Sequence, residues 1–192
     1  LTLATGAIGF GGMFAVYAYL ATTLTNVTGV SPHVVPIVFC IFGIGMTVGT
    51  YLTGLAADRA LMPTAGALLL WSAASLALFP FAAGNVYALS IVVFMIGCGG
   101  GLGTALQTRL MDVAEDAQTL AAALNHSAFN MANAIGPWLG GLAIAYGFGW
   151  TSTGWVGAAL AIGGLIVWAI SLLDERSRRS PVAKHNPALH RD

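Results

Sequence analysis

The sequence predicts an all-α membrane protein that crosses the bilayer six times. Of its 192 residues, 57% are hydrophobic and only 7% are charged, and the mean hydropathy is +0.82. A soluble domain carries about 25% charged residues, so a soluble fold of this composition could not cover its surface with polar groups. The long apolar runs lack the period-2 alternation of a membrane barrel. Because backbone groups in lipid must be paired within their own segment, the spans are expected to be helices.

The placement of charge predicts the topology. If the spans alternate in direction, all seven Lys and Arg residues lie on one side of them: Arg59, Arg109, Arg176, Arg178, Arg179, Lys184 and Arg191. Positive charge is retained in the cytoplasm, so we expect a multi-pass protein of the cell (inner) membrane with both ends of this segment cytoplasmic. The acidic residues accompany the basic ones, and no basic stripe indicates nucleic acid.

A helix needs about 20 apolar residues to cross the hydrocarbon core. That window gives six spans, in chain order 3–25, 34–57, 64–83, 86–108, 119–146 and 152–173. The remaining segment, 174–192, is charged and polar with two prolines, and is expected to be a disordered cytoplasmic tail. The chain begins without an initiator Met, so we expect a fragment whose upstream part is missing.

Prolines and short joints mark where the second, third and fourth spans begin and end. Pro32 and Pro36 open the second span, where proline is tolerated in the first turn. Pro80 lies near the end of the third. Only Gly84 and Asn85 separate the third span from the fourth, so these two helices must be adjacent and antiparallel.

Many glycines inside the spans are spaced by four residues. The pairs are Gly45/Gly49, Gly97/Gly101, Gly99/Gly103 and Gly136/Gly140. This spacing places small residues on one helix face and lets two backbones approach closely. We interpret the pairs as sites of tight helix packing.

The first and fifth spans carry the candidate binding residues. Phe14 and Tyr17 belong to an aromatic stripe on the first span, which suits either packing or the wall of a binding site. On the fifth span, His126, Asn130 and Asn133 share one stripe with a following proline. These polar residues either hydrogen-bond neighbouring helices or line a wet cavity that holds a solute.

His126 has a second possible role, because an imidazole exchanges protons near physiological pH. A titratable group within a span favours a function, so His126 is a candidate for proton coupling; the alternative is a neutral, hydrogen-bonded structural histidine. After the second span, Asp58 and Arg59 form either a clasp between helix ends or a plain solvated charge pair.

Two motifs resemble the major facilitator superfamily. The run Gly54-x-x-x-Asp58-Arg59 resembles the superfamily loop motif in its second-half copy, between helices 8 and 9. The run from Asn130 to Gly141 is similar to helix 11 of the drug:proton antiporter and sugar-efflux branch, the arabinose-efflux-permease type. Within that run, Gly136-Pro137 is similar to the Gly-Pro antiporter motif. The loop motif departs from the family pattern after Arg59, where Ala60-Leu61-Met62-Pro63 replaces a basic continuation.

The resemblance implies that residues 1–173 form helices 7–12 of a twelve-helix transporter, as two inverted three-helix repeats. It further implies export of a small, partly hydrophobic solute, drug or sugar-like, by alternating access and proton antiport. The partners would be the solute, protons, the lipid bilayer and the missing N-terminal six-helix half. Phe14, Tyr17, Asn130 and Asn133 would bind the solute. The conformational residues would be Asp58, Arg59, Gly136 and Pro137.

Three other classes of membrane protein are alternatives to a transporter. A membrane enzyme needs a nucleophilic serine motif beside a base such as His126, and no such motif is present. We therefore expect no catalytic residue, metal or cofactor. A water channel needs paired Asn-Pro-Ala turns, which Asn133-Ala134-Ile135 does not match. A non-transporting or degenerate half-size membrane partner stays open, because the loop motif is shortened.

Overall fold

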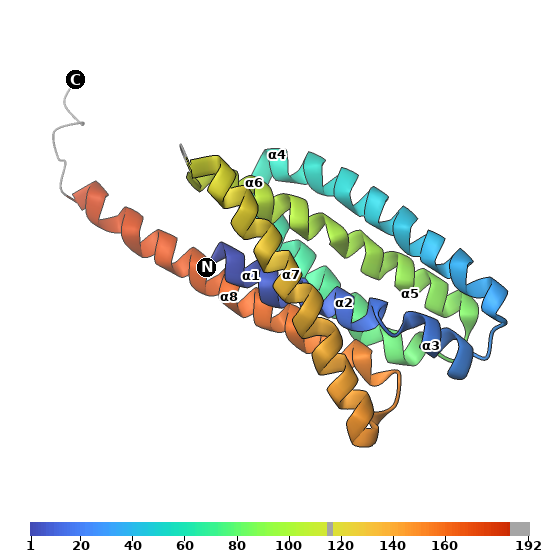
Figure 1. The fold of residues 1–192 in the computed structure, drawn as a ribbon. Helices are drawn as coiled ribbons and strands as arrows, with labels where there is room; N and C mark the ends of the chain where they lie inside the picture. The colour runs from blue at the N-terminus through green and yellow to red at the C-terminus, as the bar shows by residue number, and fades with distance from the viewer. Residues whose placement is uncertain (115–116, 185–192) are drawn as a thin grey trace.

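The computed structural model describes the backbone of residues 1–114 and 117–184, and side chains as far as residue 174. This part of the chain is all-α, as predicted, and forms an elongated bundle (Figure 1). Its α-helices are α1 Thr2–Gly9, α2 Gly11–Tyr17, α3 Leu20–Asn26, α4 Val35–Ala82, α5 Val86–Cys98, α6 Leu102–Ala114, α7 Gln118–Ala143 and α8 Ser152–Lys184. Short tighter or wider turns lie between them: the 3₁₀ turns η1 Pro32–Val34 and η2 Gly99–Gly101, and the π-helical turn η4 Ile144–Phe148.

Within the described residues, four stretches are long and apolar enough to cross a membrane: Thr2–Asn26, Pro32–Ala82, Val86–Ala114 and Ser152–Asp174. Three of them match the predicted first, fourth and sixth spans. The predicted second and third spans fall together in the stretch that contains α4. The predicted fifth span forms α7, but the polar residues singled out above keep this helix below the required apolarity.

The helix α4 contains two helical arms, 35–59 and 61–82, separated by Ala60. Ala60 has non-helical backbone angles (φ −159°, ψ 83°). Three residues later comes Pro63. Proline lacks an N–H and clashes with the carbonyl four residues back, so it is tolerated best in the first turn of a helix, which is where Pro63 lies in the second arm. Figure 1 shows the chain doubling back here, so that both arms lie beside α5. A loop of six residues was expected between the second and third spans, but only Ala60 is non-helical there.

Glycine pairs bring the first arm of α4 against α5, as their spacing predicted. A Cβ added to Gly45 would meet the Phe94 carbonyl, and one added to Gly49 would meet the Cys98 carbonyl. From the other side, a Cβ on Gly97 would meet the carbonyl of Phe42. The interpretation of these pairs as tight packing sites is confirmed, since only glycine leaves room for backbones this close.

Asn85 explains the tight joint between α4 and α5. Its side-chain oxygen accepts hydrogen bonds from the backbone N–H groups of Tyr87 (2.9 Å) and Ala88 (3.2 Å). These N–H groups have no partner inside the helix, so the asparagine caps the start of α5. The predicted short turn at Gly84 and Asn85 is thus built from the asparagine side chain.

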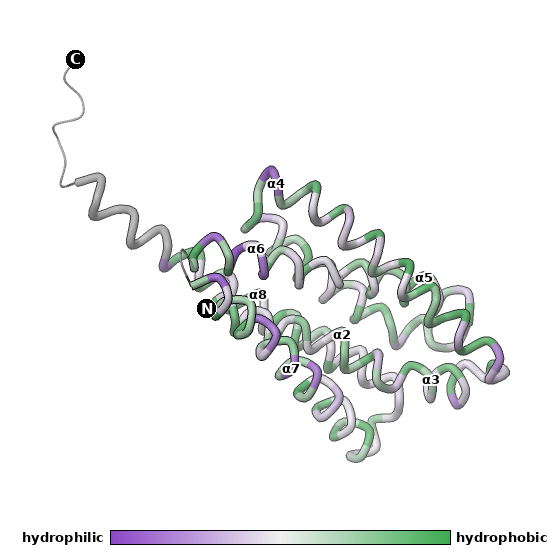
Figure 2. Tube along the Cα trace, turned by 45° about the horizontal axis from the view of Figure 1, so that its top comes forward, coloured by the Kyte–Doolittle hydropathy of each residue, from purple (hydrophilic) through white to green (hydrophobic). Residues whose placement is uncertain are grey.

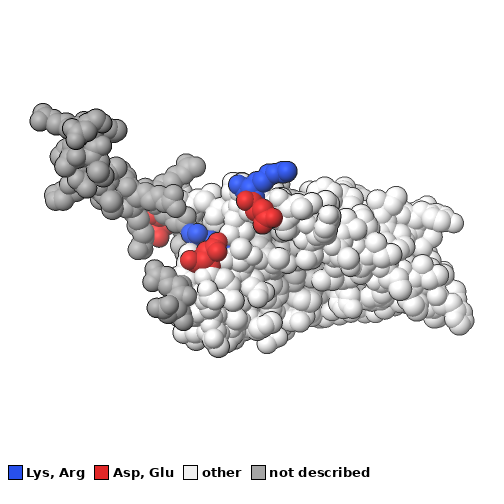
Figure 3. Space-filling view, turned by 90° about the horizontal axis from the view of Figure 1, so that it is seen from above, with Lys and Arg blue, Asp and Glu red and all other residues white. Residues whose placement is uncertain are grey.

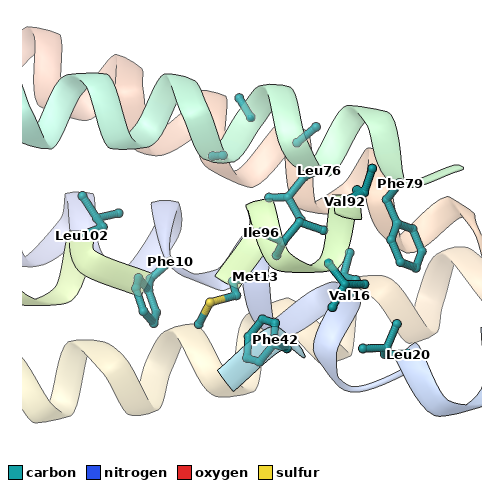
Figure 4. Packing of buried hydrophobic residues seen from close by; sticks show 14 of the residues in the cluster. Phe10, Met13, Val16, Leu20, Phe42, Leu76, Phe79, Val92, Ile96 and Leu102 are labelled. Atoms are coloured by element: carbon teal, nitrogen blue, oxygen red, sulfur yellow. The ribbon is translucent and has the colours of Figure 1, made fainter. Parts of the chain in front are cut away.

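Buried apolar side chains of α2 to α8, together with Phe10, meet in one core (Figure 4). Leu20, Leu76, Phe79 and Leu102 in it are almost wholly shielded. The indole of Trp168 on α8 donates a hydrogen bond to the Met62 carbonyl (3.0 Å). This bond ties α8 to the point where α4 doubles back.

The described charged side chains gather at one end of the bundle (Figure 3). They are Asp58, Arg59, Arg109, Asp112 and Asp174. The one-sided charge distribution read from the sequence is therefore a feature of the folded chain. The helix α8 runs to Lys184, past the predicted end of the last span at residue 173. Good helix formers such as Glu175 and Arg176 favour this continuation, and residues 185–192 of the predicted tail lie outside the described residues.

Candidate functional site

The helix α7 carries three distinct faces, and the first packs into the bundle. The buried face repeats at helical spacing and contains Ala121, Asn125, Ala128, Ala132, Gly136 and Gly140. Five of these six side chains are Ala or Gly, so α7 can lie close to α1, α2 and α8. The helix is held by backbone proximity more than by interlocking side chains.

The second face of α7 is polar and exposed. His126, Asn130 and Asn133 all lie outside the bundle core, about a third of a helical turn from the buried face. Figure 2 shows hydrophilic positions recurring along α7 while most of the bundle is apolar. The sequence predicted that these residues share one stripe, and the helix through them is unbroken. Their exposure excludes a role as hydrogen-bonding contacts in the core of this bundle.

The third face of α7 is apolar and also exposed. It comprises Leu120, Leu124, Met131 and Trp138. These residues flank the buried face on the side away from the polar stripe, as their spacing around the helix requires. Lipid suits this face, whereas the polar stripe needs water or polar partners. The two flanks of one helix thus face different surroundings.

The predicted aromatic residues Phe14 and Tyr17 pack against different neighbours. Phe14 is half-buried and packs edge-on against Phe10, whose ring meets Phe129 of α7 at a centroid distance of 4.7 Å. Tyr17 is 42% exposed and rests on Phe39 and Phe42 of α4. Packing therefore accounts for Phe14, and Tyr17 retains an open ring surface that a ligand could contact.

Gly136 and Pro137 lie where α7 crosses α2. A Cβ on Gly136 would meet the Gly11 carbonyl and would lie 2.9 Å from the Ala15 nitrogen. Pro137 has no N–H, so the Asn133 carbonyl loses its usual donor within the helix. The Tyr19 hydroxyl donates a hydrogen bond to the Pro137 carbonyl (2.9 Å). The sequence predicted no role for Tyr19, which lies near Phe14 and Tyr17 in the same span. Its hydrogen bond to α7 distinguishes it from them, and that bond cannot be read from the sequence.

We expect Tyr19→Phe to lower the free energy of unfolding by about 0.6 kcal/mol, a typical value for a hydrogen bond between membrane helices. The measurement is unfolding by SDS titration in mixed micelles. Tyr17→Phe is the matched control, because the Tyr17 hydroxyl makes no hydrogen bond with any described residue. Equal losses from both variants would show that the Tyr19 bond contributes nothing specific.

Asp58 and Arg59 are exposed at the end of the first arm of α4, beside Ala60. Neither forms an ion pair with another described residue. They belong to the group of charged side chains at one end of the bundle (Figure 3). Gly136 and Pro137 thus lie on the same helix as the stripe, and Phe14 is linked to α7 only through Phe10. Tyr17 packs on α4, and Asp58 and Arg59 lie on α4 itself.

A cavity of about 470 Å³ lies elsewhere, between the two arms of α4 and α5. None of the predicted site residues lines it. Its wall includes Leu52, Trp71 and Phe94. These residues carry no motif, and they meet only because α4 doubles back at Ala60.

The exposed stripe offers hydrogen-bond donors and acceptors rather than reactive groups. Each asparagine amide presents two donors and one acceptor oxygen, and an imidazole can take up or release a proton. Among the described residues, no group of three or more His, Cys, Asp or Glu residues could hold a metal ion. The chemistry available is therefore recognition of a polar group and transfer of a proton.

Comparisons with known proteins agree on one family. A family model described as Major Facilitator Superfamily matches residues 1–190. The inner membrane transport protein YdhP of Escherichia coli is 33% identical over 160 residues, which cover 83% of this chain and 41% of the relative. The putative transporter AraJ of Escherichia coli is 27% identical over 149 residues (77% of this chain, 38% of AraJ). A probable sugar efflux transporter of Helicobacter pylori is 29% identical over 154 residues (79% and 39%). The chain spans about two fifths of the length of these relatives.

Proposed function

Because the chain belongs to the major facilitator superfamily, we propose that it forms the second six-helix half of a transporter that exports a small, partly hydrophobic solute. Members of this family are transporters rather than enzymes, so the expectation of no enzymatic activity is confirmed. The proposed solute is drug-like or sugar-like. The names of the sugar efflux relatives support the second kind.

One observation carries the proposal: the polar stripe of α7 is exposed on a helix whose other exposed flank is apolar. In a membrane, polar side chains avoid lipid and face protein or a wet cavity. The buried face of α7 already contacts this bundle, so the stripe must be met from outside it. A second half-bundle facing α7 across a water-filled cavity provides those surroundings.

The proposed half contains six crossings in two inverted three-helix repeats. The two arms of α4, 35–59 and 61–82, would supply the second and third crossings, since each exceeds the roughly 20 residues required. The fifth crossing would be α7, whose polarity suits a cavity-lining helix. The charged end of the bundle would face the cytoplasm, in keeping with the positive-inside rule.

In this arrangement Asn130 and Asn133 orient the solute through hydrogen bonds. His126 carries the proton that moves inward in exchange for the exported solute. Tyr17 offers the apolar contact, and Phe14 supports the wall behind it. Proton antiport requires that solute and proton favour opposite states of the same site, and a titratable group beside two amides provides that competition.

Alternating access requires the bundle to rock between two packings. Gly136 and Pro137 are proposed to set the crossing of α7 on α2, where the backbones touch and one helical hydrogen bond is missing. Asp58 and Arg59 are proposed to stabilise one conformer from the charged end, with the Asp58 carboxylate pairing with a helix end of the other half.

The test is solute-driven proton flux in everted vesicles that contain the full-length protein. A pH-sensitive dye reports a preset gradient while sugars and antibiotics are added in turn. We expect one compound to collapse the gradient and His126→Gln to abolish that response, because glutamine cannot carry the proton. His33→Gln is the matched control, since His33 is exposed at the start of η1, near the end of the bundle away from the charges.

A flux response that survives His126→Gln contradicts the proton role of His126 and leaves export in place. Absence of flux with any compound, in vesicles that contain folded protein, contradicts export and favours the non-transporting membrane partner.

A further inference from the structure

The cavity between the arms of α4 and α5 is a groove that opens on the side of the bundle. Its lining contains Val48, Gly49, Leu52, Thr53, Ala56, Thr64, Ala67, Leu68, Trp71, Phe94 and Cys98. Leu52 is 56% exposed and Trp71 is 42% exposed, so the groove is open to whatever surrounds the helices. On a bundle that crosses a membrane, an apolar face that no protein covers meets lipid.

The depth of the groove matches one leaflet. Along the first arm it runs from Val48 to Ala56, which is about 12 Å of helix at 1.5 Å per residue. Half of a hydrocarbon core about 30 Å thick is about 15 Å. Ala56 and Thr64 end the groove close to Ala60, at the charged end of the bundle. The groove therefore extends from one membrane surface to near the midplane.

Two polar side chains of the groove wall are already hydrogen-bonded within the protein. The Thr64 hydroxyl donates to the Ala60 carbonyl (2.8 Å), and the Trp71 indole donates to the Met95 carbonyl (2.8 Å). Thr53 is buried against Gly101. A site for a polar solute carries a few converging polar groups to orient it, whereas this wall presents almost only carbon. An alkyl chain fits such a surface.

The hydrogen bond of Trp71 also makes the midplane end of the groove rigid. At Gly99 the helix tightens into the 3₁₀ turn η2, where backbone N–H groups bond to the Ile96 and Gly97 carbonyls. The Met95 carbonyl, just before this turn, accepts the hydrogen bond of the indole. The ring is fixed in place as one wall of the groove.

A cation stands at the membrane-surface end of the groove. Arg59 lies three residues beyond Ala56, is exposed, and forms no ion pair with another described residue. A guanidinium binds phosphate oxygens with two parallel hydrogen bonds. The groove and Arg59 together match the two parts of a phospholipid.

We propose that this groove binds one acyl chain of a phospholipid from the leaflet at the charged end, with the lipid phosphate at Arg59. The bound lipid fills the space between the arms of α4 and supports the helix reversal at Ala60. This proposal stands on the groove and the arginine, and it holds whether or not the protein exports a solute.

The test compares two alanines on the second arm of α4. Both alanines are exposed, but Ala67 lines the groove and Ala74 lies outside it. Full-length protein is delipidated in mild detergent, titrated with palmitoyl-oleoyl phosphatidylglycerol, and analysed by native mass spectrometry. We expect one tightly retained lipid in the wild-type protein and in Ala74→Phe, and its loss in Ala67→Phe, whose ring occupies the groove. Thermal unfolding of each variant verifies that it is folded.

Two further experiments locate the bound lipid. Arg59→Gln should weaken retention of phosphatidylglycerol and leave that of dioleoylglycerol, which has no phosphate, unchanged. A phospholipid with a diazirine at the end of its acyl chain should label the peptides that contain Trp71 or Phe94. Equal retention in Ala67→Phe and Ala74→Phe, no retained lipid in the wild-type protein, or a second copy of the protein in place of the lipid would each overturn the proposal.

Discussion

Replacing Gly136 with leucine is expected to separate α7 from α2 and to lower the free energy of unfolding by about 3 kcal/mol. Overpacking a well-packed interior typically costs about 1–3 kcal/mol, and more where the obstacle cannot move. Here the obstacle is backbone, because a Cβ at this position would meet the carbonyl of Gly11. No rotamer of leucine avoids the clash, since it begins at the first side-chain atom.

Neighbouring contacts leave α7 no easy way to yield. Four residues along, a Cβ on Gly140 would lie 3.2 Å from the Tyr19 ring and 3.4 Å from the Ala15 carbonyl. A shift of α7 away from α2 would also lengthen the hydrogen bond between Tyr19 and Pro137. The crossing is thus held at two levels of the helix, and relief at one level strains the other.

The measurement is unfolding by SDS titration in mixed micelles, with Ala134→Leu as the control. Ala134 lies on the same helix, two residues before Gly136, and is exposed. Ala134→Leu creates the same side chain on an exposed surface, so we expect a change below about 0.5 kcal/mol. If Gly136→Leu unfolds at the wild-type midpoint, the close approach of α2 and α7 does not exist in solution.

Much of this fold could be read from the sequence because the bilayer allows few solutions. Long apolar runs must be helices, and the one-sided charges predicted a common end for Arg59 and Arg109. Glycines spaced by four predicted tight helix packing, which the first arm of α4 makes with α5. These features depend on composition and local spacing, which a single sequence displays directly.

Other features depend on how distant segments meet, and no local pattern of residues predicts them. Nothing in Ala60 itself marks it as the residue where α4 doubles back, although Pro63 limits where a new helix can begin. Trp71 looks like any lipid-facing aromatic until Met95 is placed beside it. The groove exists only after the arms of α4 diverge, so no motif records it.

The polar stripe of α7 was predicted in part: its alignment follows from local spacing, but its surroundings depend on distant segments. Spacing alone placed His126, Asn130 and Asn133 on one face, and the helix α7 keeps that alignment. Whether the face pointed into the bundle or out of it could not be read from periodicity, because both a core and a cavity accept amides. In the structure Asn125, one residue before His126, is buried, and the stripe is exposed.

The double variant Asn130→Leu, Asn133→Leu is expected to abolish solute-driven flux while the protein remains folded and inserted. Both amides are exposed, so removing them leaves no unsatisfied partner in this bundle. Leucine is a better helix former than asparagine. Insertion and unfolding should therefore stay at wild-type values or improve slightly, and the loss should be confined to transport.

The reason for so large a transport effect is that a site built to hydrogen-bond a solute loses its orientation when the amides go. Discrimination by such groups reaches about 10⁴-fold when the partner is left unpaired, and the solute's own polar groups would be unpaired beside leucine. Met131→Leu is the control, because Met131 lies on the apolar flank of α7 and the swap preserves volume. Flux through vesicles separates the outcomes. Loss in the double variant alone identifies the polar stripe as the surface that meets the solute. Unchanged flux with both leucines in place would mean that the solute passes elsewhere, and that the stripe serves only to face the partner half.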